Sequence, residues 1–183
     1  QILSVFPHLT LTPIVGEPTL ESITLQQNEH NGNLASITSN LGDGSTGLLI
    51  ISMKPSTFLT IHPGAFVKPT NPGAAPDPIE IAAANSATKI ADIYRAHKLE
   101  ADVYAEFVDA ERISVKLALD SMDEIYYKAL KHEHTGYARV SLRALLDHLV
   151  NTYAAIDQFD LETNQAKMTE RYDPASPIET LFD

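Results

Sequence analysis

Residues 79–173 contain no proline, and Gly136 is their only glycine. Proline and glycine are the residues that most often interrupt a helix, so this interval predicts long helices with one break near Gly136. Between residues 80 and 131, apolar side chains recur at steps of three and four, which is the spacing of one helix face. A single rod of that length is unusual, and we expect two helices separated by a kink.

A second apolar stripe follows the break. Ser141 is suited to cap a helix, and the apolar side chains behind it repeat at helical spacing. These side chains are Leu142, Leu145, Leu146, Leu149 and Tyr153. Asp147 and His148 in the same stretch invite a catalytic interpretation, but neighbours on a helix point about 100° apart. We therefore expect a core helix over residues 143–156, with Asp147 and His148 on its rim.

The first part of the chain predicts shorter elements. Residues 17–32 predict a helix with Pro18 in its first turn and Thr19 or Glu17 as its cap. Residues 48–51 follow three glycines and have the sequence LLII, which predicts a tight turn and a short β-strand. One or two helical turns are expected from Pro55. The whole pattern predicts a mostly α fold with a short N-terminal β-turn/strand element.

Residues 62–78 contain five prolines and two glycines. This composition predicts an exposed loop with local polyproline character. Two interpretations stay open for it. It is either a simple connector or a loop that contacts a partner through Pro69, Pro72 and Pro76, since long loops within domains often have a function.

Charge and composition exclude several classes of function. The formal net charge is −11, and the 13 lysines and arginines are scattered, whereas nucleic-acid binding depends on clustered cations. We expect RNA contact only through regions outside this chain. The chain has no cysteine, which excludes disulfides and thiolate metal sites. No apolar run approaches the ~18–20 residues of a membrane helix, so no membrane association is expected.

No group of residues has the spacing of a catalytic or cofactor site. His132 and His134 are two positions apart and do not share a helix face, and no second ligand cluster accompanies them. The glycine-rich stretch at residues 42–47 lacks the lysine of a phosphate-binding loop. We therefore expect no enzyme activity, no metal, no cofactor and no small-molecule substrate.

One stretch resembles a known family. Residues 115–156, VKLALDSMDEIYYKALKHEHTGYARVSLRALLDHLVNTYAAI, resemble the Gag polyprotein of copia-type long-terminal-repeat retrotransposons. Ser141 is at the family's cap position, Leu145 and Leu146 replace its usual aromatic residue, and Leu149 and Tyr153 match its last two anchors. The segments FPHLTLTPIVGEPTLESI and YDPASPIETLF, in this order, are similar to Gag-like open reading frames of marine microalgae.

The resemblance implies a retroviral-capsid-like helical bundle. Residues 1–156 would form a domain like the capsid N-terminal domain, and residues 157–183 a linker and the start of a C-terminal-like helical domain. It further implies a structural protein that associates with itself, as a homo-oligomer, into cytoplasmic virus-like particles enclosing retroelement RNA. The chain departs from the family in lacking tryptophan and a zinc knuckle. The alternative is a helical adaptor or a domesticated Gag-like protein that does not assemble.

Overall fold

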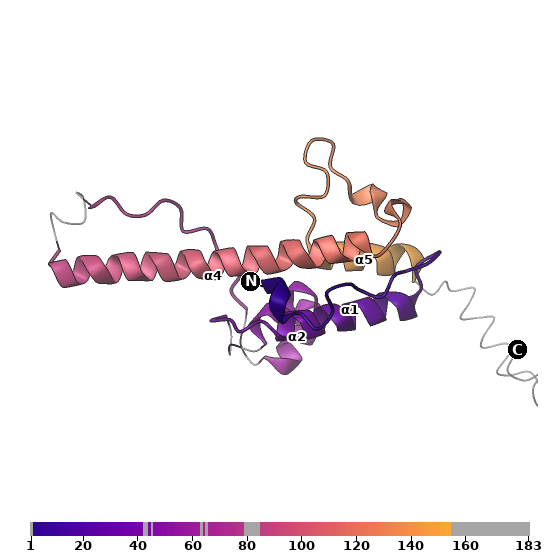
Figure 1. Ribbon diagram of the computed structural model, residues 1–183, viewed down its shortest axis with the longest axis horizontal. Helices are drawn as coiled ribbons and strands as arrows, with labels where there is room; N and C mark the ends of the chain where they lie inside the picture. Colours follow the sequence, from indigo (N-terminus) through magenta and orange to yellow (C-terminus); the bar gives the residue numbers. More distant parts are fainter. Residues whose placement is uncertain are drawn as a thin grey trace, which may run out of the picture.

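The computed structural model describes residues 2–41, 44, 46–62, 64, 66–78 and 85–154. Within these residues all regular structure is helical, which confirms the mostly α prediction (Figure 1). The predicted boundary between residues 156 and 157, and the C-terminal segment after it, lie outside the described residues. The elements in chain order are η1 (Ile2–Val5), α1 (Leu20–Ala35), η2 (Gly47–Ile51), α2 (Pro55–Ile61), α4 (Ala87–Asp120), η3 (Glu124–Tyr126), η4 (Lys128–Leu130) and α5 (Leu142–Tyr153), where η marks a 3-10 helix.

The core forms where α5 contacts both α1 and the C-terminal part of α4. The predicted core helix is confirmed as α5, and the Ser141 hydroxyl caps it by accepting a hydrogen bond from the Ala144 N–H at 3.1 Å. Four of its apolar side chains are at most 1% exposed, namely Leu142, Leu145, Leu146 and Leu149. Tyr153 is half-buried at the edge of the core, where its ring packs against the edge of Tyr126. The apolar stripe of α5 therefore supplies the centre of the fold.

The kink expected within the helical stretch of residues 80–131 is absent from α4, which is one continuous helix of 34 residues. The stretch does not stay helical to residue 131, because α4 ends at Asp120 and a turn and the short helices η3 and η4 follow. Helix α4 begins at Ser86, whose hydroxyl accepts from the Lys89 N–H, and contains neither proline nor glycine. It ends at Ser121, whose hydroxyl turns back to donate to the Ala118 carbonyl at 2.7 Å. The Ser121 carbonyl in turn accepts a hydrogen bond from the Ile14 N–H at 2.8 Å. The N-terminal segment thus binds the first carbonyl group after the end of α4.

The predicted strand at residues 48–51 is also wrong, because these residues form the 3-10 helix η2. Leu48, Leu49 and Ile51 are all buried, so this run packs on more than one side. From the sequence alone, a short apolar run buried in this way cannot be told from a buried β-strand. A Cβ added at Gly47 would collide with the Leu41 carbonyl group. Glycine at this position therefore permits a close backbone contact at the start of η2.

Helix α1 confirms the predicted N-terminal helix and extends it through Gly32 to Ala35. Thr19 is the cap, in a reciprocal pair of hydrogen bonds with Ser22, and Pro18 precedes the cap instead of entering the first turn. The buried face of α1 is largely polar. Three of these polar side chains bind the backbone of the N-terminal segment.

Three side chains of α1 hold residues 8–12 in place. Asn33 accepts from the His8 N–H and donates to the His8 carbonyl, both at 2.9 Å. Glu29 accepts from the Thr12 N–H at 2.8 Å and from the Thr12 hydroxyl at 2.6 Å. Gln26 donates to the Thr12 carbonyl at 2.9 Å and to the Ser121 hydroxyl at 2.7 Å. These contacts satisfy the backbone of a segment without regular structure, as burial requires.

His30 lies on the same helix and is fully buried. Neither of its ring nitrogens has a hydrogen-bond partner among the described residues. Burial lowers the pKa of His30 from 6.5 to about 4, while the neighbouring carboxylate of Glu29 acts in the opposite direction. His30 is therefore a neutral core residue near pH 7.

A carboxylate placed on the buried face of α5 should unfold the domain. Leu145→Asp or Leu149→Asp would bury an unpaired charge at a cost of several kcal/mol, comparable with a typical total stability of ~5–15 kcal/mol. Circular dichroism should show loss of helix in both variants. Ala144→Asp is the matched control, because Ala144 is exposed in the first turn of the same helix. Native helix content and an unchanged melting temperature in Leu145→Asp would contradict this assignment of the core.

His30 predicts that the protein loses stability in mild acid. A depressed folded-state pKa means that the unfolded chain binds the proton first, so stability falls as the pH drops from about 6.5 towards about 4. His30 alone should account for a loss of about 3 kcal/mol over that range. Urea unfolding of His30→Leu against pH should show a smaller loss than wild type. Equal slopes in the two proteins would rule out His30 as the source.

Candidate interaction surfaces

The residues that the sequence analysis selected lie in different parts of the structure. The leucines of α5 lie in the interior, so they cannot contact a partner while the domain is folded. Asp147 and His148 contact different groups: Asp147 accepts from Arg143 at 2.8 Å, and His148 Nε2 lies 3.1 Å from the Tyr126 carbonyl. Pro69, Pro72 and Pro76 lie at the surface, and each is half-buried. Three surfaces remain as candidates for interaction: the proline segment, an apolar groove and the exposed part of α4.

The first surface is the proline segment, residues 66–78, which lies along α4 (Figure 1). At one end the Lys68 ammonium pairs with Glu111 at 3.8 Å and lies 5.1 Å from the centre of the Phe107 ring. At the other end the Tyr94 hydroxyl donates to the Pro76 carbonyl at 3.2 Å. The segment therefore runs antiparallel to the helix and is anchored at both ends.

The lengths of the two partners match. From residue 68 to residue 76 an extended polyproline chain rises about 25 Å, at ~3.1 Å per residue. From residue 111 back to residue 94 a helix covers the same ~25 Å, at ~1.5 Å per residue. The half-buried residues Phe66, Pro69, Pro72 and Pro76 recur at steps of three and four, close to the three residues per turn of polyproline. One face of the segment thus rests on α4, which the sequence had not predicted.

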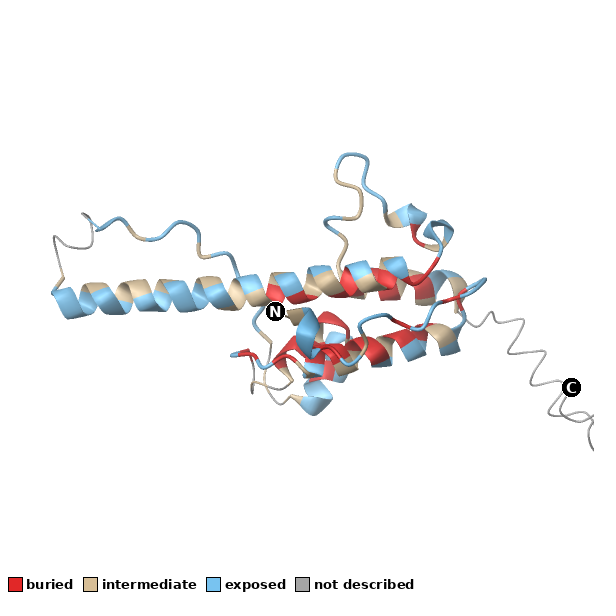
Figure 2. Ribbon diagram, viewed as in Figure 1, coloured by how far each residue is buried: buried red, intermediate tan, exposed pale blue. Residues whose placement is uncertain are grey.

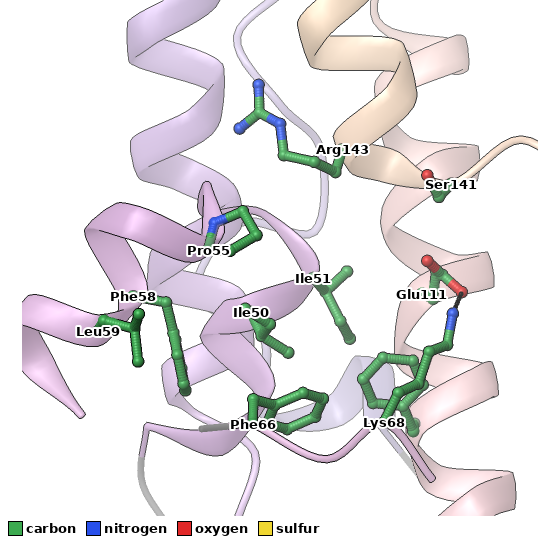
Figure 3. Close-up of a pocket in the computed structure, with 11 residues that line it drawn as sticks. Ile50, Ile51, Pro55, Phe58, Leu59, Phe66, Lys68, Glu111, Ser141 and Arg143 are labelled. Carbon is green, nitrogen blue, oxygen red and sulfur yellow. Dashed lines mark ion pairs between the residues drawn. The ribbon is translucent and has the colours of Figure 1, made fainter. Parts of the chain in front are cut away.

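The second surface is an apolar groove of about 470 Å³ (Figure 3). Its floor contains three aromatic rings in series, with Phe66 at 5.8 Å from Phe58 and at 5.9 Å from Phe107, between ring centres. Its rim carries the Lys68–Glu111 ion pair and Arg143. The lining comes from η2, α2, the proline segment, α4 and the start of α5, which are far apart in the sequence.

Arg143 joins this groove to the rest of the core. Its guanidinium donates to the Ser52 carbonyl at 2.6 Å and to Asp147 at 2.8 Å. The Ser52 hydroxyl in turn contacts Asn31 of α1. The buried Nε of Arg143 has no partner among the described residues. Arg143 thus fixes the end of η2 against α5 through two of its five N–H donors.

The third surface is the arm, which we define as residues 87–106 of α4. The first buried residue of α4 is Phe107, so none of these residues is buried (Figure 2). The arm extends ~30 Å along the helix axis, at ~1.5 Å per residue. Among the described residues the proline segment lies alongside most of the arm in Figure 1, and at the C-terminal end of the arm Glu106 accepts a hydrogen bond from the Ser39 hydroxyl at 2.7 Å. Leu99 lies in the middle of the arm and is 53% exposed.

The charges along the arm are segregated. Residues 87–98 carry the three cations Lys89, Arg95 and Lys98 against one carboxylate, Asp92. Residues 99–111 carry five carboxylates and no lysine or arginine; these are Glu100, Asp102, Glu106, Asp109 and Glu111. Within the arm as the structure describes it, the ion pair is Arg95–Asp92 at 2.8 Å. Most of these charges therefore face solvent.

The two histidines weighed as metal ligands lie in an exposed turn. His132 and Gly136 exchange backbone hydrogen bonds there, and the His134 N–H contacts His132 Nδ1 at 3.2 Å. Among the residues that the structure describes, no group of three or more His, Asp or Glu side chains could hold a metal ion. In the same part of the chain, no helix has the length and apolar character needed to cross a membrane.

Comparison with known proteins adds no relative: no protein-family model, curated protein or solved structure matches this chain. The groove had no signal in the sequence, because five separate segments form it. The arm had a signal in the sequence, because the charge segregation over residues 89–111 is visible there. Only the structure shows that none of the residues of the arm is buried.

The proline segment should stabilise the arm and leave the core unaffected. Replacing residues 69–76 by a Gly-Ser linker of equal length removes the half-buried prolines and the stiffness of the segment. Amide hydrogen exchange over residues 87–106 should become roughly tenfold faster or more, with little change over residues 107–120 and in α5. Pro72→Ala alone is the milder control. A large drop in melting temperature would show instead that the segment belongs to the core.

Proposed function

We propose that this chain is the structural Gag protein of a retroelement, which associates with itself into particles that enclose the element's RNA. The sequence supports this through the resemblance of residues 115–156 to copia-type Gag. The buried leucines of α5 would then be the core of the Gag-like motif, within a retroviral-capsid-like bundle. RNA would bind through regions outside this chain, because the chain itself carries a net charge of −11.

The arm is the observation that supports self-association most directly. An isolated helix of fewer than ~12–15 residues is marginal in water, and most helices in proteins depend on a buried apolar face. The arm has no buried residue over 20 positions; the proline segment lies along it, and Val103 and Glu106 near its C-terminal end contact the core and the Ser39 hydroxyl. Symmetric contacts between copies would supply the missing burial, and repeated contacts of this kind build closed shells.

A second candidate is a helical adaptor that does not assemble, and the apolar groove favours it. Three aromatic rings line this groove beside the charged side chains Lys68, Glu111 and Arg143. Apolar grooves with a few polar groups at the rim commonly receive a segment of a partner. In this case the groove, and not the arm, would be the functional surface.

Negative-stain electron microscopy of the purified chain distinguishes the two candidates. The Gag proposal predicts regular shells or tubes at high protein concentration, with light scattering that rises with concentration. The adaptor predicts monodisperse monomers under the same conditions. Phe66→Ala, which removes the central ring of the groove, should leave particle yield unchanged if the groove has no part in assembly. Monomers at every concentration and salt condition would refute the Gag proposal.

A further inference from the structure

We propose that the arm pairs antiparallel with the arm of a second copy, about a two-fold axis close to Leu99. This inference rests on the proposed self-association and names the surface through which it begins. The occupant of the exposed arm surface is therefore another molecule of this chain. Four observations on the arm lead to this conclusion.

The first observation is the order of the charges. Within the arm, residues 87–98 have three cations and one carboxylate, whereas residues 99–106 have three carboxylates and no lysine or arginine. Asp109 and Glu111 continue the acidic run beyond the arm, where Glu111 is paired with Lys68. When two such helices lie antiparallel, the basic half of each faces the acidic half of the other. Parallel pairing would place like charges together along the whole length, which is unfavourable. The arm is thus complementary to itself in one orientation only.

The second observation is a cation in the first turn of the helix. Cations near the N-terminus of a helix and carboxylates towards its C-terminus oppose the helix dipole. The first turn of α4 has no acidic residue and contains Lys89, and the last turn has no basic residue. Lys89 therefore opposes the helix dipole in the isolated chain, and a facing copy would offer it a carboxylate.

The third observation is the face that stays free. The half-buried residues Tyr94, His97, Ala101 and Tyr104 lie on one side of the arm, and the Tyr94 hydroxyl joins that side to the proline segment. The opposite side follows the three- and four-residue steps of a helix seam. It presents the exposed residues Asp92, Arg95, Leu99 and Asp102, and it ends at Glu106, which is half-buried and accepts a hydrogen bond from the Ser39 hydroxyl at 2.7 Å.

The fourth observation is the position of Leu99 at the centre of this side. It is the large apolar residue of the seam, it is 53% exposed, and the charge changes sign beside it, between Lys98 and Glu100. A two-fold axis through this point places the two Leu99 side chains together, flanked by opposite charges. A small apolar contact framed by complementary charge fixes both the register and the orientation of such a pair.

Charge reversal tests the pairing on the full chain, with sedimentation equilibrium as the measurement. Arg95→Glu with Lys98→Glu leaves Lys89 as the one lysine or arginine of the arm, and Glu100→Lys with Asp102→Lys leaves five lysines and arginines against Asp92 and Glu106. Each double variant alone should raise the dissociation constant of the dimer by roughly tenfold or more. An equimolar mixture of the two should restore association as a mixed dimer. Lys116→Glu is the matched control, because Lys116 is exposed on the same helix beyond the arm.

Cysteine cross-linking tests the register, because the chain has no cysteine of its own. Leu99→Cys should form a disulfide-linked dimer rapidly under a mild oxidant. Val15→Cys should not, although Val15 is 88% exposed and random collision would favour it. Equal rates at the two positions, or no re-association in the mixture of the two charge-reversed proteins, would overturn the proposed pairing.

The outcomes also separate this inference from the proposed function. If particles form while the charge-reversed variants assemble normally, arm pairing is wrong and the Gag proposal stands. If the wild type forms the Leu99-centred dimer but no particles under any condition, arm pairing stands and the Gag proposal fails. A wild type that is monomeric at every concentration removes both.

Discussion

The hydrogen bonds between α1 and the backbone of residues 8–12 organise the rest of the core. A helix normally packs through apolar side chains, whereas α1 presents Gln26, Glu29 and Asn33 to a segment without regular structure. These side chains supply the backbone partners that a strand or helix would supply for itself. Gln26 also contacts Ser121 at the end of α4, so one side chain connects the N-terminal segment, α1 and the turn after the longest helix. Such a network specifies the geometry only if all its members are present, since a lost partner leaves a buried polar group unsatisfied.

Secondary structure was predicted correctly from the sequence where one face of a helix is buried, because apolar residues then repeat at helical spacing. Helix α5 is the clearest example, because its four buried leucines and its Ser141 cap are visible in twelve residues. The sequence failed where burial came from several directions, as in η2, whose apolar run packs within the core instead of in a sheet. The prediction of a kink in α4 also failed. Helix α4 is continuous because it contains no residue that breaks a helix, and its length alone was a poor reason to divide it.

The candidate surfaces show the same division. The proline segment was recognisable by composition, but its role depends on a match between two lengths, ~25 Å of polyproline and ~25 Å of helix, that only the coordinates display. The groove depends on long-range packing and has no local signature. The proline segment and the arm are best understood together. The proline segment covers one side of the arm. Because the proline segment is stiff, it loses little conformational entropy when it packs there.

Net charge and local charge act on self-association at different ranges. Two copies with a charge of −11 each repel one another as a whole, and at physiological ionic strength this repulsion is screened beyond ~8 Å. Contacts between side chains a few ångströms apart are screened much less. An acidic chain can therefore associate with itself wherever its few cations are placed to meet carboxylates of a second copy. The arm meets this requirement, because Lys89, Arg95 and Lys98 are exposed on the same helix as a run of five carboxylates without a cation.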